Sequence, residues 1–329
     1  MVSSMALVYT MKCNASCRIC CFDCTPNRQE KMTISQAKKY VDETLAHNSI
    51  RAVGFSGGEA LLYLDEICNI AAYTRSKGIS RISVSTNGFW ATDEVKTREV
   101  LSKLHSSGIN VLDLTADEYH QEFIPIDNIK NILAVSEDFR VGIHITTMVT
   151  EGSMRLVDIL PNLGANTIGK SLIEHKVLPI GAAKQNNIPV IKNNLIIDET
   201  ATCNTLDTFA IFPDGDVYPC CSQYCRNELL KLGNMDIDGI EMIKKKYNSN
   251  MVIRILRKHG FKWFLDRCPE LGINYVTLCD MCNALINDKD KFNKAFGSHI
   301  EEEMKNIYEA YLKQQAEQQN SNTLTEGVV

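Results

Sequence analysis

The stretch Cys13-Asn14-Ala15-Ser16-Cys17-Arg18-Ile19-Cys20 spaces three cysteines as C-x3-C-x2-C, just beyond a short apolar run. Three thiolates on one tight loop can bind three irons of a [4Fe-4S] cluster, because soft sulfur ligands suit such clusters. A fourth iron would have no cysteine from this loop and would stay open for another ligand. Two other interpretations stay open for these residues alone: a zinc knuckle that adds Cys24, and a cysteine-rich loop without metal.

The composition is that of an ordinary soluble globular protein, with 44% hydrophobic and 23% charged residues among 329. This length favours one large domain and a smaller one. A net charge of −5 argues against a nucleic-acid binder, which usually has a basic face. No apolar run approaches the ~20 residues of a membrane span, and the first residues lack the features of a secretory signal. We therefore expect a cytoplasmic protein whose partners include neither nucleic acid nor membrane.

Thirteen cysteines are unusual for a chain expected in the cytosol, where disulfides rarely persist. Clustered cysteines in that compartment more often bind metal or act in catalysis. All but Cys68 fall into two groups, and Cys68, on a predicted helix, is interpreted as a small core residue. The two groups predict two metal centres, and they consist of Cys13, Cys17, Cys20, Cys21 and Cys24, then Cys203, Cys220, Cys221, Cys225, Cys268, Cys279 and Cys282.

The first 180 residues alternate between strand and helix patterns. Six such units predict an α/β fold with a parallel sheet and right-handed crossovers, either curled into a barrel or open and doubly wound. In both forms ligands bind at the carboxyl ends of the strands. The predicted strands are 6–11, 52–55, 82–85, 111–114, 141–149 and 172–177, and the predicted helices are 33–47, 65–76, 93–105, 126–135 and 156–163, with Thr33 as a helix cap.

Each sequence motif falls directly after one of these strands. The cysteine loop follows the first, Gly57-Gly58-Glu59 the second, Thr86-Asn87-Gly88 the third, and Asp117 to His120 the fourth. The two glycines allow a close backbone approach, and Glu59 offers a carboxylate to a cation. Because carboxyl ends of parallel strands meet at one edge of the sheet, we expect these motifs to form one site.

Together these motifs resemble the radical S-adenosylmethionine (SAM) enzymes. The resemblance covers roughly residues 6–180 and implies a partial (β/α)6 TIM barrel, with SAM bound through its amino and carboxylate groups to the open iron of the [4Fe-4S] cluster. It implies Cys13, Cys17 and Cys20 as iron ligands, Gly57, Gly58 and Glu59 at the SAM amino group, Ser85 and Asn87 at the aminoacyl or ribose groups, and Asp117 at a ribose hydroxyl.

Alternatives remain for several of these positions. Asn87 could be a turn residue, and Asp117 a solvated loop acid. The family usually has an aromatic residue against the adenine where this chain has Ile19. Cys21 and Cys24 are interpreted as core or loop cysteines.

The second cysteine group resembles the SPASM or twitch extension of radical SAM enzymes, which carries auxiliary iron–sulfur clusters. Two β-like runs flank Pro213-Asp214-Gly215-Asp216 and predict a hairpin. The resemblance implies one auxiliary [4Fe-4S] cluster, with Cys268 as a competing ligand and a zinc ribbon as the alternative. We expect the barrel in residues 1–180, the cluster domain in 181–297, and a capped helix with a polar tail in 298–329, the cluster ligands being Cys203, Cys220 (or Cys221), Cys279 and Cys282.

One thiol of the Cys220-Cys221 pair is then left over, and a thiol readily donates a hydrogen atom to a carbon radical. Cys13 to Pro26 and Asp117 to Gln121 particularly resemble the epimerases of ribosomally synthesised peptides. In these enzymes a 5′-deoxyadenosyl radical removes an α-hydrogen and a thiol returns one to the opposite face. We assign the donor to Cys221, with Cys220 and Cys225 as alternatives.

We therefore expect a peptide epimerase that acts on a ribosomally synthesised precursor peptide and is reduced by a flavodoxin- or ferredoxin-type electron donor. The alternatives are a thioether or carbon–carbon crosslinking enzyme and a non-catalytic zinc or redox-sensing protein. Because the chain begins directly at the barrel, we expect the barrel mouth, the C-terminal domain or another protein to recognise the peptide.

Overall fold

The structure is a computed structural model that describes residues 2–47, 50–198, 200–222, 224, 226–297 and several positions between 299 and 312. Within these residues, no helix is both long and apolar enough to cross a membrane. The predicted cap at Ser298 and the polar tail from residue 320 lie outside the described residues, whereas 299–302 are helical.

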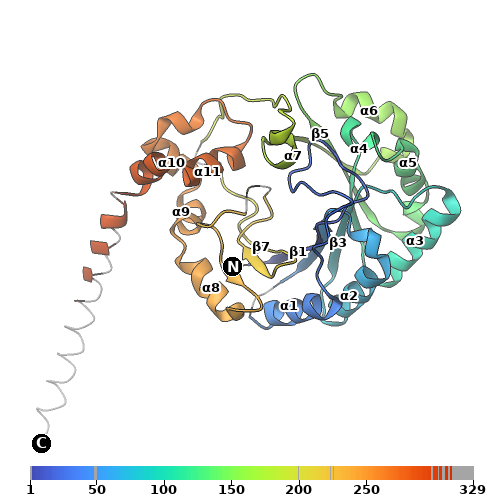
Figure 1. Cartoon of the computed structure of the whole chain (residues 1–329), viewed down its shortest axis with the longest axis horizontal. Coiled ribbons are helices and arrows are strands. Elements are labelled where there is room, and N and C mark those ends of the chain that lie inside the picture. Colours follow the sequence, from blue (N-terminus) through green and yellow to red (C-terminus); the bar gives the residue numbers. More distant parts are fainter. Residues whose placement is uncertain are drawn as a thin grey trace, which may run out of the picture.

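The first part of the chain forms the predicted strand–helix units. Their strands pair in parallel in the order β6-β5-β4-β3-β2-β1, which confirms the partial barrel. Figure 1 shows the helices along the outer rim of this curved sheet. The elements are β1 (Ser4–Thr10), α1 (Ile34–His47), β2 (Ala52–Gly57), α2 (Leu64–Ser76), β3 (Arg81–Thr86), α3 (Glu94–Ser106), β4 (Val111–Thr115), α4 (Glu118–Gln121), α5 (Ile126–Val135), β5 (Gly142–Val149), α6 (Leu156–Leu163) and β6 (Ser171–Lys176), with short 3-10 turns at Ala60–Tyr63, Ser136–Phe139 and Ala165–Thr167.

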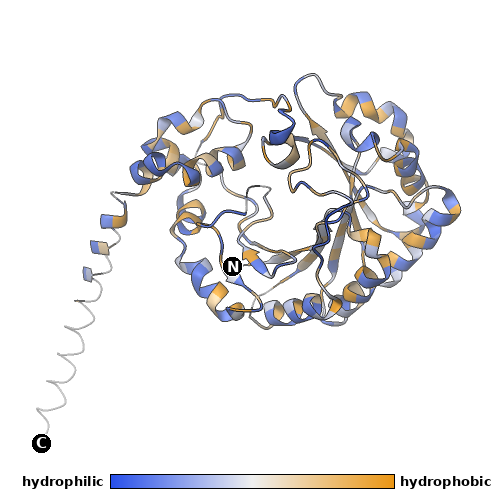
Figure 2. Cartoon of the chain, in the orientation of Figure 1, coloured by the Kyte–Doolittle hydropathy of each residue, from blue (hydrophilic) through white to orange (hydrophobic). Residues whose placement is uncertain are grey.

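Local sequence signals account for these elements. The Thr33 cap is confirmed, because Gln36 N donates to Thr33 Oγ1 at 3.2 Å and Thr33 N donates to Gln36 Oε1 at 3.0 Å. Every second residue of β5 is buried, as in Ile143 and Ile145, which join the main core. Figure 2 shows hydrophobic and hydrophilic residues alternating along the rim helices, as expected for helices that cover a sheet on one side.

The C-terminal part extends the same sheet. Strand β7 pairs in parallel with β1, in the register Ser4↔Thr208 to Leu7↔Ile211, and β8 and β9 follow antiparallel. The described strands therefore form one sheet, in the order β6-β5-β4-β3-β2-β1-β7-β8-β9. The remaining elements are α7 (Gly181–Gln185), β7 (Thr208–Ile211), β8 (Asp216–Tyr218), β9 (Gly233–Asn234), α8 (Gly239–Ser249), α9 (Met251–His259), α10 (Lys262–Arg267), a 3-10 turn at Pro269–Gly272 and α11 (Leu278–Asn287).

The predicted hairpin is confirmed, and its turn lies between Ile211 and Asp216. Gly215 has φ +82°, a backbone conformation that other residues rarely adopt. A Cβ at this position would also lie only 2.8 Å from Asn234 Oδ1, so a larger residue would strain the backbone and clash with a neighbour. The sheet continues through the expected domain boundary at residue 181, and that boundary stays a prediction.

Candidate active site

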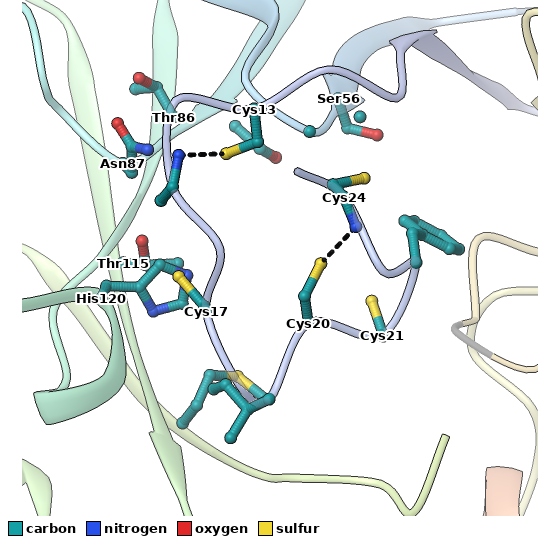
Figure 3. A pocket seen from close by; sticks show the side chains of 17 residues that line it. Cys13, Cys17, Cys20, Cys21, Cys24, Ser56, Thr86, Asn87, Thr115 and His120 are labelled. Carbon is teal, nitrogen blue, oxygen red and sulfur yellow. Dashed lines mark hydrogen bonds between the residues drawn. The ribbon is translucent and has the colours of Figure 1, made fainter. Parts of the chain in front are cut away.

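A cavity of about 240 Å³ lies at the carboxyl ends of β1 to β5. Its lining brings together the three cysteines of the first motif and residues that follow β2 and β3, as the motif positions predicted. Figure 3 shows these side chains around the curve of the cysteine loop. The predicted site residues that line the cavity are Cys13, Cys17, Cys20, Gly57, Gly58, Ser85 and Asn87.

Backbone amides support the sulfur atoms of the loop. Ala15 N donates to Cys13 Sγ at 3.4 Å, and Cys24 N donates to Cys20 Sγ at 3.3 Å (Figure 3). Burial raises the pKa of Cys13 to about 11 and also raises that of Cys17, whereas a hydrogen bond from the Cys24 side chain lowers the pKa of Cys20 to about 6. A bound metal deprotonates its thiol ligands outright, so these residues fit the three irons of a [4Fe-4S] cluster.

The two glycines fix the base of this loop. A Cβ on Gly57, whose φ is +143°, would lie 2.1 Å from Thr10 O, and a Cβ on Gly58 would lie 2.2 Å from Lys12 O. The same close approach allows Gly58 N to donate to Thr10 O at 2.8 Å and Glu59 N to Lys12 O at 2.9 Å. Only glycine leaves room for this contact between the end of β2 and the start of the cysteine loop.

The Glu59 carboxylate connects the ends of β2 and β3. Its side chain is buried, with 1% of the residue exposed, and accepts hydrogen bonds from Leu61 N at 3.0 Å and Asn87 N at 2.8 Å. Burial raises the pKa of Glu59 to about 7, against the effect of these bonds. Gly57 and Gly58 line the cavity and Glu59 does not. A contact between its carboxylate and SAM therefore stays a prediction.

Asn87 links β3 to the cysteine loop. Its Nδ2 donates to Asn14 Oδ1 at 2.9 Å, and its Oδ1 accepts from Phe89 N at 3.0 Å. The Oδ1 atom therefore has the local backbone contact expected of a turn asparagine. The side chain also lines the cavity, where it could contact SAM. Ser85, two residues earlier on β3, also lines the cavity.

Asp117 is fully buried, so its interpretation as a solvated loop acid is wrong. It caps α4 by accepting from Tyr119 N at 3.1 Å and His120 N at 3.0 Å, and its Oδ2 lies 2.8 Å from His120 Nδ1. His120, rather than Asp117, lines the cavity. Although burial lowers the pKa of His120, the bond to Asp117 outweighs it and raises that pKa. The sequence signal for this pair is the spacing Asp-x-x-His at the start of a helix, which brings a capping carboxylate close to a histidine three residues later.

Ile19 lines the cavity where the family has an aromatic residue, and it packs in a small core cluster with Ala15, Cys17 and Tyr119. Cys24 is buried in the main core, as predicted, and Cys21 is half-buried at the cavity wall.

A second, smaller cavity of about 30 Å³ is lined by all four cysteines predicted as auxiliary ligands, namely Cys203, Cys220, Cys279 and Cys282. The last two lie in the first turns of α11, which Thr277 caps. A helix N-terminus favours the thiolate form, which helps a thiol bind metal. Burial raises the pKa of Cys279 and raises that of Cys282 to about 12.

The two competing cysteines that the structure describes do not line this cavity. Cys268 is buried outside this cavity, with Sγ 3.5 Å from Lys291 O. Cys221 is exposed and does not line it, and Cys225 lies outside the described residues. Within the described ranges no three His, Cys, Asp or Glu side chains are close enough to share one metal ion. A cluster that takes one sulfur per iron does not require such a group.

The strand register places part of the auxiliary centre toward the start of β1, whereas Cys13 follows the carboxyl end of that strand. Cys203 precedes β7, whose Thr208 pairs with Ser4, and β8 runs back from the hairpin turn toward Cys220. Cys279, however, packs against a small cluster of Leu178, Tyr224 and Val276 that also contacts Ile180. Ala182 N, two residues after Ile180, donates to Cys20 O at 2.9 Å, so the auxiliary centre also approaches the cysteine loop.

Comparisons with known proteins agree with these two centres. The family model of the radical SAM superfamily matches residues 7–150, and that of the SPASM iron–sulfur cluster-binding domain matches residues 203–270. YydG of Bacillus subtilis (strain 168), a protein whose name assigns it provisionally to peptide biosynthesis, is 31% identical over 86% of this chain and 91% of its own length.

Solved structures share the fold at low identity. The structure of anSMEcpe with AdoMet and the Cp18Cys peptide covers 92% of this chain and 99% of its own, with a TM-score of 0.56 and 16% identity. Streptococcus suis SuiB bound to precursor peptide SuiA covers 78% and 67%, with a TM-score of 0.55 and 13% identity. The chain belongs to the radical SAM superfamily, whose enzymes bind SAM at a [4Fe-4S] cluster, and it carries a SPASM iron–sulfur domain after the barrel.

Proposed function

We propose that this enzyme converts an L- to a D-amino acid residue in a ribosomally synthesised peptide. One observation carries the proposal: of two adjacent cysteines, Cys220 lines the auxiliary cavity and Cys221 is exposed outside it. The Cys221 thiol is therefore not needed as a cluster ligand and is available to react with the substrate. Family membership removes the non-catalytic zinc or redox-sensing alternative.

A peptide substrate is supported by the relatives. YydG is named for peptide biosynthesis, and the anSMEcpe and SuiB structures hold peptides. We extend this to a precursor peptide for the present enzyme, with a flavodoxin- or ferredoxin-type protein as its electron donor.

The proposed reaction divides into hydrogen removal and hydrogen return at one carbon. Cys13, Cys17 and Cys20 would hold the cluster and SAM, which would supply the radical that removes the α-hydrogen of a peptide residue. Cys221 would then break its S–H bond and form a new C–H bond on the opposite face of the same carbon. Opposite-face delivery needs a donor that reaches this carbon from the side away from SAM, and we assign that role to Cys221, which follows β8.

Regeneration follows from the electron count. After donation Cys221 holds one unpaired electron on sulfur, and one electron and one proton restore the thiol. The reductive cleavage of SAM takes another electron, so each turnover consumes two electrons from the external donor. Crosslinking would instead remove two hydrogens from the peptide.

We propose one auxiliary [4Fe-4S] cluster, held by Cys203, Cys220, Cys279 and Cys282. Its support is that these four cysteines line one small cavity while Cys268 is buried apart from it. Anaerobically reconstituted enzyme should then contain about eight irons per chain.

The test uses reconstituted enzyme, SAM, a reductant and a synthetic copy of the peptide encoded beside the gene, all in D2O. Epimerisation predicts a gain of one mass unit at a residue that becomes D-configured, because the exchangeable thiol delivers deuterium. A loss of two mass units would reject epimerisation in favour of crosslinking.

A further inference from the structure

A row of polar side chains crosses the inner face of the sheet, the face that carries the cavity-lining residues Ser85, Thr115 and Met148. The strand register pairs Ser85 with Asp113, Asp113 with His144, and His144 with Ser171, on four successive strands from β3 to β6. We call these four residues the polar row. Three strand spacings separate its ends, about 14 Å.

The direction of these side chains follows from the strand period of two. Asp113 lies two residues before Thr115, and His144 four residues before Met148, so each shares its neighbour's face. The residues between them, Leu112, Leu114, Ile143 and Ile145, are buried in the main core on the outer face. Asp113 and His144 therefore lie on the inner face, between the SAM cavity and the amino-terminal end of the strands.

Stability does not explain the central pair. His144 Nδ1 lies 2.8 Å from Asp113 Oδ1, with 33% and 37% of the two side chains exposed. Even as an ion pair, two side chains as open as these would contribute only ~0–1 kcal/mol. Parallel sheets, moreover, usually bury apolar residues on both faces. A polar, partly exposed row on the inner face of such a sheet fits a surface that binds a polar chain.

The geometry defines what His144 can offer. In the neutral ring, Asp113 accepts the proton of Nδ1 and so holds the ring orientation, which leaves Nε2 as an acceptor. Among the residues that the structure describes, the ring has no further hydrogen-bond partner. The N–H groups of a peptide main chain are the matching donors. Ser85 at one end of the row lines the SAM cavity, and Ser171 at the other lies on β6, the edge strand of the sheet.

We infer that the polar row is the binding track for the substrate main chain, with His144 accepting a peptide N–H and Asp113 as the positioning residue that holds the ring. This rests on the proposed function, since it requires a peptide substrate. The track leads from the edge strand of the sheet to the SAM cavity. Because it contacts the main chain, binding along it should depend little on the peptide's side chains.

The test measures peptide binding without turnover. A fluorescein-labelled synthetic copy of the peptide encoded beside the gene is titrated, by anisotropy, with reconstituted enzyme and SAM in the absence of reductant. His144→Ala should weaken binding about tenfold, the range expected for one lost hydrogen bond, and His144→Gln, which keeps an acceptor near Nε2, should stay within about threefold of wild type. His105→Ala, an exposed histidine on α3, is the matched control and should bind as wild type.

Asp113 is tested through its partner. Asp113→Asn should weaken binding about threefold in the wild-type enzyme and change nothing in a His144→Ala background, because it acts through the ring. Iron content and melting temperature, measured alongside, identify any variant that has lost its fold.

The outcomes separate the two proposals. Wild-type enzyme that does not bind the peptide would overturn the proposed function and the track together. Wild-type binding that His144→Ala leaves unchanged would overturn the track alone, as would equal weakening by His105→Ala or full additivity of the Asp113→Asn and His144→Ala effects.

Discussion

Gly58 offers the sharpest test of how the fold holds the SAM cluster. Its Cβ, if present, would lie 2.2 Å from Lys12 O and 3.0 Å from Cys13 N, and both contacts are with backbone. No side-chain rotation can relieve them, so Gly58→Ala must move the cysteine loop away from β2 by about 1 Å, the shortfall from an ordinary contact. Ligand–metal distances vary by only about 0.2 Å. The displaced loop should therefore fail to bind its cluster.

The energetic cost can be estimated from the same contacts. The shift strains two backbone hydrogen bonds, Gly58 N to Thr10 O and Glu59 N to Lys12 O, each worth about 0.5–1.5 kcal/mol. With the overpacking itself, we expect a loss of roughly 2–4 kcal/mol, or about 3–6 °C in melting temperature for a chain of this size.

The assay is iron content after anaerobic reconstitution, together with thermal denaturation. Gly58→Ala should retain about four irons, those of the auxiliary cluster, and lose the other four. Gly297→Ala is the matched control, because a Cβ there meets nothing within 4 Å. Full iron content and a wild-type melting temperature in Gly58→Ala would refute the steric argument.

Three further changes probe the two cavities. Cys282→Ala should lower the iron content to about four per chain, whereas Cys268→Ala should leave it at about eight; the reverse pattern would exchange their roles. Tyr224→Phe removes the hydroxyl that donates to Asp280 Oδ1 at 2.9 Å, so thermal denaturation should show a loss of about 1–3 kcal/mol, and an unchanged melting temperature would contradict a structural role for this bond. Asn87→Ala should weaken SAM binding about tenfold in equilibrium dialysis with iron content retained, and wild-type affinity would remove Asn87 from the SAM site.

Local patterns in the sequence were enough to predict the strand–helix units, and the family resemblance chose the barrel over an open sheet. Alternation in β5 and the cap at Thr33 depend only on neighbouring residues, and the structure confirms both. The motifs at the carboxyl ends of successive strands were predicted to meet for the topological reason that parallel strands share one edge, and the cavity lining agrees. The four auxiliary cysteines were grouped through the family resemblance, and they line one cavity.

Features that depend on long-range pairing were not predictable. Nothing near Thr208 indicates that β7 pairs with β1, so the continuation of the sheet into the C-terminal part was not predicted. The pair of Asp113 and His144 depends on the register of two strands, which the sequence does not encode locally. From the sequence, Asp117 was assigned to a ribose hydroxyl of SAM. Its burial and its contact with His120 could not be predicted, because both follow only from the folded loop.

The central claim is that Cys221 returns the hydrogen atom, and one comparison tests it directly. Wild-type, Cys221→Ala and Cys68→Ala enzymes are incubated with SAM, reductant and the peptide encoded beside the gene in D2O, and the peptide is examined by mass and by the configuration of its residues. The account predicts one deuterium per D-residue from wild type and from Cys68→Ala, whose cysteine lies on α2, and none from Cys221→Ala. Deuterated D-residues from Cys221→Ala would contradict it.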